Sequence, residues 1–147
     1  FRSINNKFFD KYIYKKRNEA LNSKYSFYTP KGKISAKEIL NGVNNNKNIF
    51  LLVDQKDSAG VFIDFFGNKV KTQIGFLKIA RKYNLQLIPM RNIRLPNNKF
   101  KITFEKPLEH NNNLISDEEK MLEINNIIEK WIKENPENWF WQHKRFN

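Results

Sequence analysis

A carboxylate and an amide follow the most apolar stretch of the sequence. Ile49–Val53 reads as a short buried strand, and Asp54 and Gln55 come directly after it. In α/β folds, substrates bind and side chains react beyond the carboxyl ends of such strands. Asp54 is therefore the leading candidate for a functional side chain, with Gln55 beside it. Capping the turn that follows the strand is an equally compatible role for Asp54.

The two histidines of the chain lack the partner that a general base needs. A catalytic histidine is oriented by a carboxylate, which also fixes its tautomer. His110 has Ile115 five residues later, and His143 is followed by only four residues. Neither forms a His-x4-Asp/Glu pair, so neither is predicted to act as a general base.

Other kinds of catalytic or metal site find no support in the composition. The chain contains no cysteine, which excludes disulfides, thiolate nucleophiles and Cys-ligated metals. With only two histidines and no suitable carboxylate cluster, no zinc site is expected. No Gly-x-Ser-x-Gly motif occurs, and the five glycines do not form a phosphate-binding loop.

The formal net charge of +12 predicts an anionic partner. Phosphate-bearing lipids, nucleic acid and acidic proteins would all be attracted to such a surface. Part of this charge is also typical of a composition rich in Lys and Asn. An arginine could bind a phosphate through two hydrogen bonds, but the candidates are scattered along the chain: Arg2, Arg17, Arg91, Arg94 and Arg145.

The last residues of the chain combine aromatic and basic side chains. Trp139, Phe140, Trp141 and Phe146 alternate with His143, Lys144 and Arg145. One interpretation is a platform on which the bases of single-stranded nucleic acid stack. Packing of the rings into the core is the more common fate of such a cluster, and we favour it.

Helices are expected where apolar residues recur at helical spacing or where a capping box stands. The first begins near Asn5 and carries Lys7, Lys11, Lys15, Lys16 and Arg17 on its polar side. Further helices are predicted from the Ser35/Glu38 capping box to Asn44–Asn46, over Val70–Tyr83 with Asn84 as left-handed cap, from Ser116/Glu119 to Asn135, and from Pro136.

Strands are expected at the apolar or alternating runs between these helices. They are predicted within Tyr25–Gly32, at Ile49–Val53, at Gln86–Ile93 with a bend at Pro89, and at Lys99–Phe104, the last two joined by a turn at Pro96. A further apolar run, Val61–Phe66, closes on Gly67. The alternation predicts an α/β layered fold: a mostly parallel sheet with a late antiparallel hairpin, and helices packed around it.

The chain is expected to be one portion of a single domain, residues 1–147. No internal repeat or linker divides it, and no apolar run approaches the length of a membrane span. It opens with Phe1-Arg2-Ser3, without Met or the features of a signal peptide. The sequence is therefore interpreted as a fragment of a longer protein.

Four stretches together resemble one known family. The chain is similar to the C-terminal half of the bacterial late acyltransferases of lipid A biosynthesis, the lauroyl and myristoyl transferases of the lysophospholipid acyltransferase superfamily. The stretches are Phe1–Asn6, Asp54-Gln55 with Phe65-Phe66-Gly67, Ile88-Pro89, and Pro136–Trp139 continuing into Trp141–Phe146. The second and fourth are the most specific, because their order and spacing both fit.

The resemblance implies an enzyme that moves a fatty acyl chain from acyl carrier protein to a hydroxyl of a lipid A precursor. In this family a His-x4-Asp/Glu pair deprotonates the acceptor hydroxyl, upstream of the stretch with which this chain opens. The resemblance therefore implies that the catalytic pair and a membrane anchor lie upstream, and that this piece alone is inactive. It implies no cofactor besides the acyl donor, acyl carrier protein or acyl-CoA.

Several residues match supporting parts of the family's substrate site. Arg17, Asp54 and Arg2 match residues that line it, with Gln55 adjacent, and the arginines are implied to face anionic groups of the substrate or carrier protein. Phe66, Gly67 and Pro89 match structural positions. The chain departs from the family at Ser3, where Pro is common, and at Lys144, where Arg is common.

The implied partners are acyl carrier protein, a lipid A precursor and a membrane surface, and nucleic acid is not among them. The implied location is the cytoplasmic face of the bacterial inner membrane. Apolar side chains of Val61–Phe66 either line an acyl channel or pack in the core. Two alternatives remain: a basic nucleic-acid-binding module, and an acyltransferase-like domain that binds lipid or carrier protein without catalysis.

Overall fold

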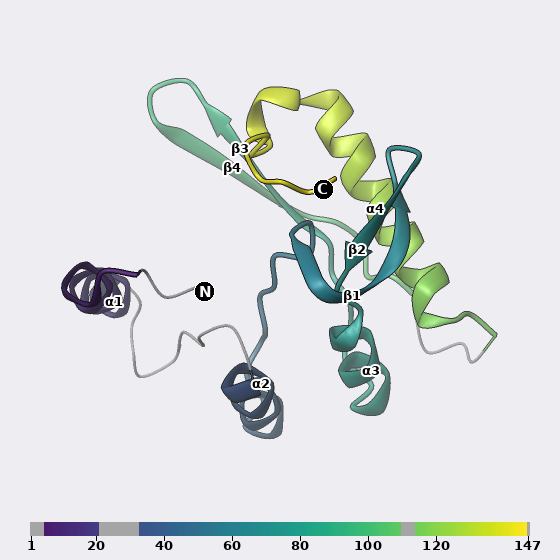
Figure 1. Cartoon of the computed structure of the whole chain (residues 1–147), viewed down its shortest axis with the longest axis horizontal. Helices are drawn as coiled ribbons and strands as arrows, with labels where there is room; N and C mark the ends of the chain where they lie inside the picture. The colour runs from purple at the N-terminus through teal and green to yellow at the C-terminus, as the bar shows by residue number, and fades with distance from the viewer. Residues whose placement is uncertain (1–4, 21–32, 110–113, 147) are drawn as a thin grey trace. The chain divides into compact units, whose positions relative to one another are not determined.

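A computed structural model describes the chain at residues 5–20, 33–109 and 114–146 (Figure 1). It divides into two compact units, residues 1–50 and 51–147, and each is described by itself. The described residues form four α-helices and two antiparallel sheets of two strands each. The prediction of a single domain is not tested by this division and stays a prediction.

The first unit contains two helices. Helix α1 spans Lys7–Ala20, and its amino end is capped by Asn6 Oδ1, which accepts hydrogen bonds from Phe8 N at 3.0 Å and Phe9 N at 3.3 Å. Helix α2 spans Lys33–Asn44. Both predicted helices are confirmed, but α2 begins two residues before Ser35, so Ser35 is not its N-cap. The strand predicted within Tyr25–Gly32 lies outside the described residues.

The second unit opens with the hairpin of β1, Lys56–Phe65, and β2, Asn68–Thr72. Its two turn residues, Phe66 and Gly67, have φ values of 50° and 72°. Positive φ at both positions matches the right-handed twist of the flanking strands, which is why such two-residue turns close hairpins. The side chain of Asn68 supports the turn by donating to the Phe66 carbonyl at 2.9 Å.

The predicted strand Ile49–Val53 is wrong. This stretch has no regular secondary structure, and the strand begins only at Lys56. Apolar composition alone does not make a strand, because the backbone also needs a partner to hydrogen-bond, and Ile49–Val53 pairs with none of the described strands. Asp54 and Gln55 therefore precede β1 instead of ending a strand.

The expected parallel sheet is not found among the described residues either. The apolar run Val61–Phe66 enters the tight turn at Phe66-Gly67 and returns at once as β2. A parallel neighbour would need a crossover of a dozen or more residues, which this turn does not provide. Both sheets are antiparallel hairpins, and the fold matches the predicted layered architecture only as a mixed α/β structure.

Helix α3 is shorter than predicted and spans Gly75–Lys82. The helix expected from Val70 begins five residues later because Val70 and Thr72 alternate with Lys69 and Lys71, the period of a strand, and this segment pairs with β1. Asn84, with φ of 50°, takes the left-handed conformation predicted for it after the helix.

The predicted late hairpin is confirmed. Strands β3, Met90–Leu95, and β4, Lys99–Phe104, pair from Met90↔Phe104 to Leu95↔Lys99 around a turn at Pro96–Asn98. Pro89 precedes β3 instead of lying within a strand, and its carbonyl accepts from Glu105 N at 2.9 Å. A missing N–H is tolerated at such a position.

Helix α4, Asp117–Glu134, begins at the predicted capping box. Ser116 Oγ accepts from Glu119 N at 3.2 Å, and Glu119 Oε2 accepts from Ser116 N at 2.8 Å. These hydrogen bonds from Ser116, first from its backbone and then from its hydroxyl, lower the pKa of Glu119. Beyond α4, the helix predicted from Pro136 is only a single 3-10 turn, η1, Pro136–Asn138.

The core of the second unit lies between the β1–β2 hairpin and α4, which run side by side in Figure 1. One buried cluster comprises Ile63, Ile74, Leu77 and Met121, and a second comprises Phe65, Val70 and Ile132. Ile63 and Phe65 therefore serve as core residues, which favours packing over an acyl channel as the role of this run. Asn125 joins helix to strand by donating from Nδ2 to Asp64 O at 2.8 Å.

The described residues contain neither a candidate membrane-spanning helix nor a cluster of metal-binding side chains. None of their helices combines the length and the apolar composition that crossing a membrane requires. No three of their His, Asp or Glu side chains lie close enough together to hold a metal ion.

Candidate functional site

The indole of Trp139 holds the carboxylate of Asp54. Trp139 Nε1 donates a hydrogen bond of 3.0 Å to Asp54 Oδ2, joining residues that are 85 positions apart. Both side chains are half-buried, so water weakens this bond less than it would on an open surface. The bond fixes one carboxylate oxygen, and no described residue hydrogen-bonds the other, Oδ1.

Arg145 lies buried beside this pair, with an exposed fraction of 1%. Its Nη1 donates to Lys71 O at 2.7 Å and its Nη2 to Thr72 Oγ1 at 2.8 Å. Burial lowers the pKa of the Arg145 guanidinium, and the negative charge of Asp54 opposes that shift. Asp54 thus offsets part of the electrostatic cost of keeping a cation inside the unit.

The ring of Phe65, fully buried, is the platform on which the C-terminal stretch packs. Phe146 stacks on it with ring centres 5.8 Å apart, and Trp139 tilts against it at 5.9 Å. The Arg145 guanidinium lies 5.2 Å from its centre, a cation–π contact. The packing therefore brings the C-terminal aromatic and basic residues onto β1, next to the Phe66-Gly67 turn.

The turn at Phe66 is strained and held from α4. A bulky side chain at φ of 50° is uncommon, and the left-handed conformation costs about 1–2 kcal/mol. Glu129 Oε1 accepts a hydrogen bond of 2.7 Å from Phe66 N, and Lys133 Nζ lies 5.5 Å from the Phe66 ring centre. Strain maintained by surrounding contacts is characteristic of functional sites.

Comparison with known proteins decides the family. A family model described as bacterial lipid A biosynthesis acyltransferase matches residues 1–147, the whole chain. The chain belongs to this family. A search of curated proteins gives no match.

Two of the stretches that resemble the lipid A acyltransferases are brought together by the fold. Asp54 and Phe65–Gly67 lie before and within the first hairpin, and Trp139–Phe146 packs against both. The sequence names these stretches as the most specific signs of the family, but it does not indicate that they touch. We define this cluster of Asp54, Phe65, Thr72, Trp139 and Arg145 as the Asp54 cluster.

The other predicted site residues make none of the contacts that define the Asp54 cluster, or they lie outside the described residues. Arg17 is exposed on α1, in the first unit, and Arg2 lies outside the described residues. Gln55 is exposed beside Asp54, and Pro89 precedes β3. The roles assigned to these residues stay predictions.

Sequence reasoning missed Arg145, Trp139 and Thr72 as members of a site. In the sequence, Arg145 is one of several scattered arginines, and Trp139 fits either core packing or a platform for stacking bases. Its indole N–H is bonded to Asp54, and its ring packs at a tilt against Phe65. Only their place in the sequence could have indicated a shared site, because Trp139 and Arg145 both belong to the C-terminal stretch that marks the family.

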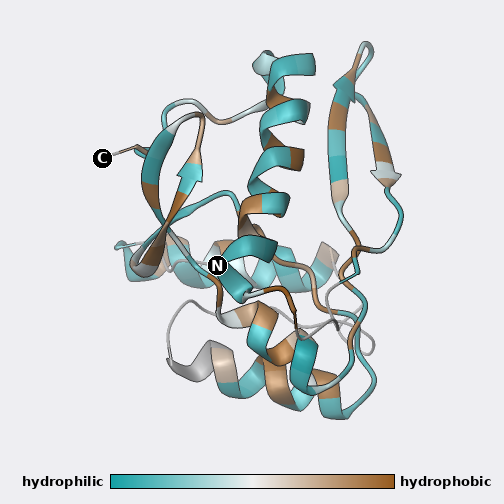
Figure 2. Ribbon diagram, turned by 90° about the vertical axis from the view of Figure 1, so that its right-hand side faces the viewer, coloured by the Kyte–Doolittle hydropathy of each residue, from teal (hydrophilic) through white to brown (hydrophobic). Residues whose placement is uncertain are grey.

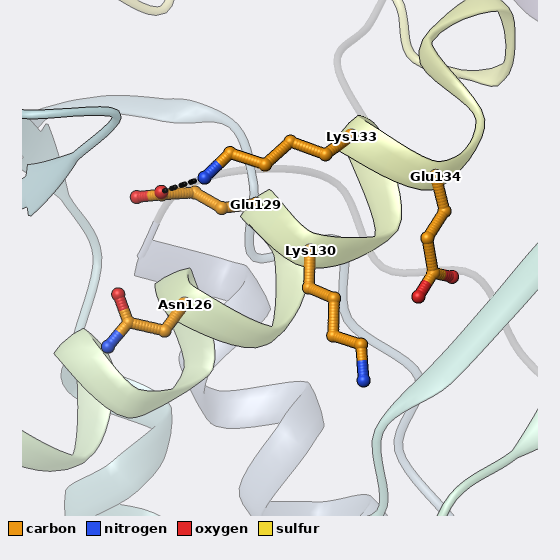
Figure 3. Close-up of a pocket in the computed structure, with 5 residues that line it drawn as sticks. All are labelled: Asn126, Glu129, Lys130, Lys133 and Glu134. Atoms are coloured by element: carbon orange, nitrogen blue, oxygen red, sulfur yellow. Dashed lines mark ion pairs between the residues drawn. The ribbon is translucent and has the colours of Figure 1, made fainter.

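A surface hollow on α4 is lined by none of the residues of this cluster. It has a volume of about 450 Å³ and is lined by Asn126, Glu129, Lys130, Lys133 and Glu134 (Figure 3). All five side chains project from one helix, and Lys133 Nζ pairs with Glu129 Oε2 at 3.8 Å. Two of these side chains already have partners elsewhere, Glu129 at Phe66 N and Glu134 at Arg91, and the hollow is lined by one helix alone, so we interpret it as a solvated face and not as a formed substrate site.

The bond between Trp139 and Asp54 should be measurable as a coupling energy. We expect a double-mutant cycle of Trp139→Phe and Asp54→Ala to give about 1.5–3 kcal/mol, the value of a hydrogen bond to a charged acceptor. Urea unfolding of the four proteins, followed by far-UV circular dichroism, supplies the free energies.

Trp141 provides the matched control for this cycle. Its Nε1 donates to Pro136 O at 2.6 Å, so Trp141→Phe also removes an indole donor, but one that does not reach Asp54. The cycle of Trp141→Phe with Asp54→Ala should give a coupling within about 0.5 kcal/mol of zero. Equal coupling in both cycles would contradict a direct bond.

Proposed function

We propose that this chain is part of an acyltransferase that moves a fatty acyl chain from acyl carrier protein to a hydroxyl of a lipid A precursor. The observation that carries the proposal is membership of the lipid A biosynthesis acyltransferase family over residues 1–147. In the reaction, the hydroxyl oxygen forms a bond to the thioester carbonyl carbon while the hydroxyl proton passes to a base. The carbon–sulfur bond then breaks, and the sulfur leaves as the thiol of the carrier protein, which takes up that proton.

The base is proposed to lie outside these residues. No histidine of the chain has an acidic residue five positions later, as the family's His-x4-Asp/Glu pair requires. The chain alone is therefore expected to be inactive, and the pair is expected upstream, together with a membrane anchor at the cytoplasmic face of the inner membrane. The acyl thioester and the acceptor hydroxyl supply every atom of this exchange, so no further cofactor is proposed.

Asp54 is proposed to support the substrate site and not to catalyse. Its Oδ2 is held by Trp139, which leaves Oδ1 able to accept a hydrogen bond from a substrate hydroxyl or amide. Gln55, exposed next to it, offers both a donor and an acceptor. Arg17 and Arg2 are proposed to bind anionic groups of the lipid A precursor or the carrier protein, which the net charge of +12 would also attract.

An acyl-transfer assay tests the function. The chain is compared with a version extended upstream through the His motif, using acyl carrier protein charged with acyl chains, a lipid A precursor in detergent micelles, and mass spectrometry of the product ester. We expect transfer by the extended protein alone, and loss of that transfer when the motif histidine is replaced by alanine.

The supporting residues are tested in the same extended protein. Asp54→Ala and Arg17→Ala should each lower kcat/KM by about tenfold or more, a loss of about 1.4 kcal/mol. Lys78→Ala, on an exposed position of α3, should leave it unchanged. Activity in the short chain would contradict the missing base, and an inactive extended protein with an intact pair would contradict the function.

A further inference from the structure

Regular backbone structure does not fix the direction of the Asp54 carboxylate. Residues 49–55 belong to no helix or strand, and β1 begins only at Lys56. The preceding side chain, Val53, packs on the buried core of the second unit. Within the described residues, the hydrogen bond from Trp139 is the one that acts on the carboxylate itself. The orientation of that carboxylate therefore depends on where the indole of Trp139 lies.

The indole of Trp139 is held in place by aromatic packing. Its ring tilts against Phe65 at 5.9 Å and lies edge-on to Phe146 at 6.4 Å and to Trp141 at 4.8 Å. Its backbone N–H donates to Pro136 O at 3.3 Å. Figure 2 shows the last described residues beside the β1–β2 hairpin, which carries the Phe65 ring. A ring packed on several sides loses little further freedom when its N–H binds a carboxylate, so the indole is a preorganised donor.

The buried guanidinium of Arg145 attracts Asp54 from the same stretch of chain. Its Nε has no hydrogen-bond partner among the described residues, and no described carboxylate forms an ion pair with it. Burial lowers the pKa of Arg145, and the charge of Asp54 opposes that shift. Because a buried cation is costly and an apolar side chain of similar size often stabilises a fold at least as well, the charge indicates a role besides packing.

The second oxygen of the Asp54 carboxylate is left for a ligand. Asp54 is half-buried, and no described residue hydrogen-bonds its Oδ1. An indole N–H needs only a neutral acceptor, since the neighbouring Trp141 donates to a backbone carbonyl, Pro136 O, at 2.6 Å. A charged acceptor with one free oxygen exceeds what the Trp139 N–H requires. The arrangement therefore points to an interaction of Oδ1 with a substrate.

We propose that Trp139 is a positioning residue for acyl transfer, which acts by aiming Asp54 Oδ1 at an N–H or O–H group of a substrate. The inference rests on the proposed function, because it takes the substrates from that reaction. The lipid A precursor and acyl carrier protein both carry such groups. In this arrangement the C-terminal stretch that marks the family serves the substrate site through a single hydrogen bond.

Substrate binding tests the positioning role without turnover. The protein extended upstream through the His motif is made with the motif histidine replaced by alanine. Its affinities for a lipid A precursor in detergent micelles and for acyl carrier protein charged with an acyl chain are measured separately by calorimetry. Trp139→Phe keeps a ring but removes the donor, so it should weaken one of the two affinities about fivefold. The substrate whose affinity falls is the one that Asp54 contacts, and two unchanged affinities would overturn the proposal.

A double-mutant comparison separates positioning from a general loss of stability. Asp54→Ala should weaken the same affinity about tenfold, and Trp139→Phe should then add less than about twofold, because the carboxylate through which the indole acts is gone. Trp141→Phe keeps a ring beside Trp139 and removes an indole N–H that donates elsewhere, so it should leave the affinity unchanged. Losses that multiply in the double variant, or an equal effect of Trp141→Phe, would contradict the positioning role.

Kinetics of the extended protein with its histidine intact give a second readout. Trp139→Phe should raise KM for the same substrate about fivefold and leave kcat within about twofold of the original value. Partial unfolding would instead reduce the amount of active protein, which lowers kcat and leaves KM unchanged. A fall in kcat alone would therefore show that Trp139 is only structural.

The two proposals fail in different ways. If the extended protein transfers acyl chains but Trp139→Phe leaves both affinities unchanged, only the positioning role is wrong. If Trp139→Phe weakens binding through Asp54 but the extended protein with its His pair is inactive, only the proposed reaction is wrong.

Discussion

Replacing Arg145 by alanine should lower the free energy of unfolding by about 3 kcal/mol. The guanidinium is 1% exposed and makes two hydrogen bonds, to Lys71 O and Thr72 Oγ1. Its removal leaves these acceptors without their donor, empties the space beside Phe65, and leaves the charge of Asp54 without the nearby cation. Urea unfolding followed by far-UV circular dichroism measures the loss.

Two further variants identify which property of Arg145 matters. Arg145→Lys keeps the charge, but a single ammonium on a shorter stem does not reproduce the planar fork that reaches two acceptors, so we expect a loss of about 2 kcal/mol. Lys144→Ala, at the exposed neighbouring position, should change stability by less than about 0.5 kcal/mol. A mild effect of Arg145→Ala, equal to that of Lys144→Ala, would show that the C-terminal stretch is not held by this residue.

Replacing Gly60 by alanine should cost about 3 kcal/mol as well, for a steric reason. A Cβ at this position would lie 2.3 Å from Thr72 O and 2.5 Å from Thr72 C, so two backbones would have to separate. The close approach of Gly60 to Thr72 results from the irregular pairing of β1. Both Lys56 and Val61 pair with Thr72, so the strand bends around that residue. Thr72 is also where Arg145 binds, so the substitution should disturb the Asp54 cluster.

Substitutions at two other glycines of the second unit should cost less stability and serve as comparisons. Gly67 has open space where a Cβ would be, but its φ of 72° strains any other residue, so Gly67→Ala should cost about 1 kcal/mol. Gly75 begins α3, and its nearest neighbour would be a flexible side-chain atom of Gln73 at 3.9 Å. Gly75→Ala should therefore be neutral or stabilising by up to about 1 kcal/mol. A smaller cost at Gly60 than at Gly67 would contradict the close approach of β1 to Thr72.

Local patterns predicted the elements that depend on neighbouring residues. The capping box at Ser116 and Glu119, the left-handed Asn84 and the hairpin around Pro96 all form as expected. Each depends on contacts within a few residues, and those residue types favour them in most surroundings. The same reasoning failed at Ile49–Val53, because a strand depends on a partner elsewhere in the chain.

The candidate site was predicted only in part. The sequence indicates Asp54 through a strand end that the structure does not contain, yet Asp54 lies in the cluster because Trp139 donates to it. Nothing in the sequence distinguishes Arg145 from the other arginines of this basic chain. Its side chain is buried because it packs on the β1–β2 hairpin, and the residues next to it in sequence do not determine that packing. Arg17 lies in the other unit, and its role still depends on the resemblance alone.

The sequence by itself determined the family, through the order and spacing of its motifs, and it determined the absence of a His-x4-Asp/Glu pair within these residues. Both follow from residue identity along the chain. The tertiary structure decided what those motifs do together. Phe65, Asp54 and Thr72 meet Trp139, Arg145 and Phe146 because burial of the aromatic rings brings the two ends of the second unit together. Contacts between residues more than 70 positions apart arise from packing, and no local pattern specifies them.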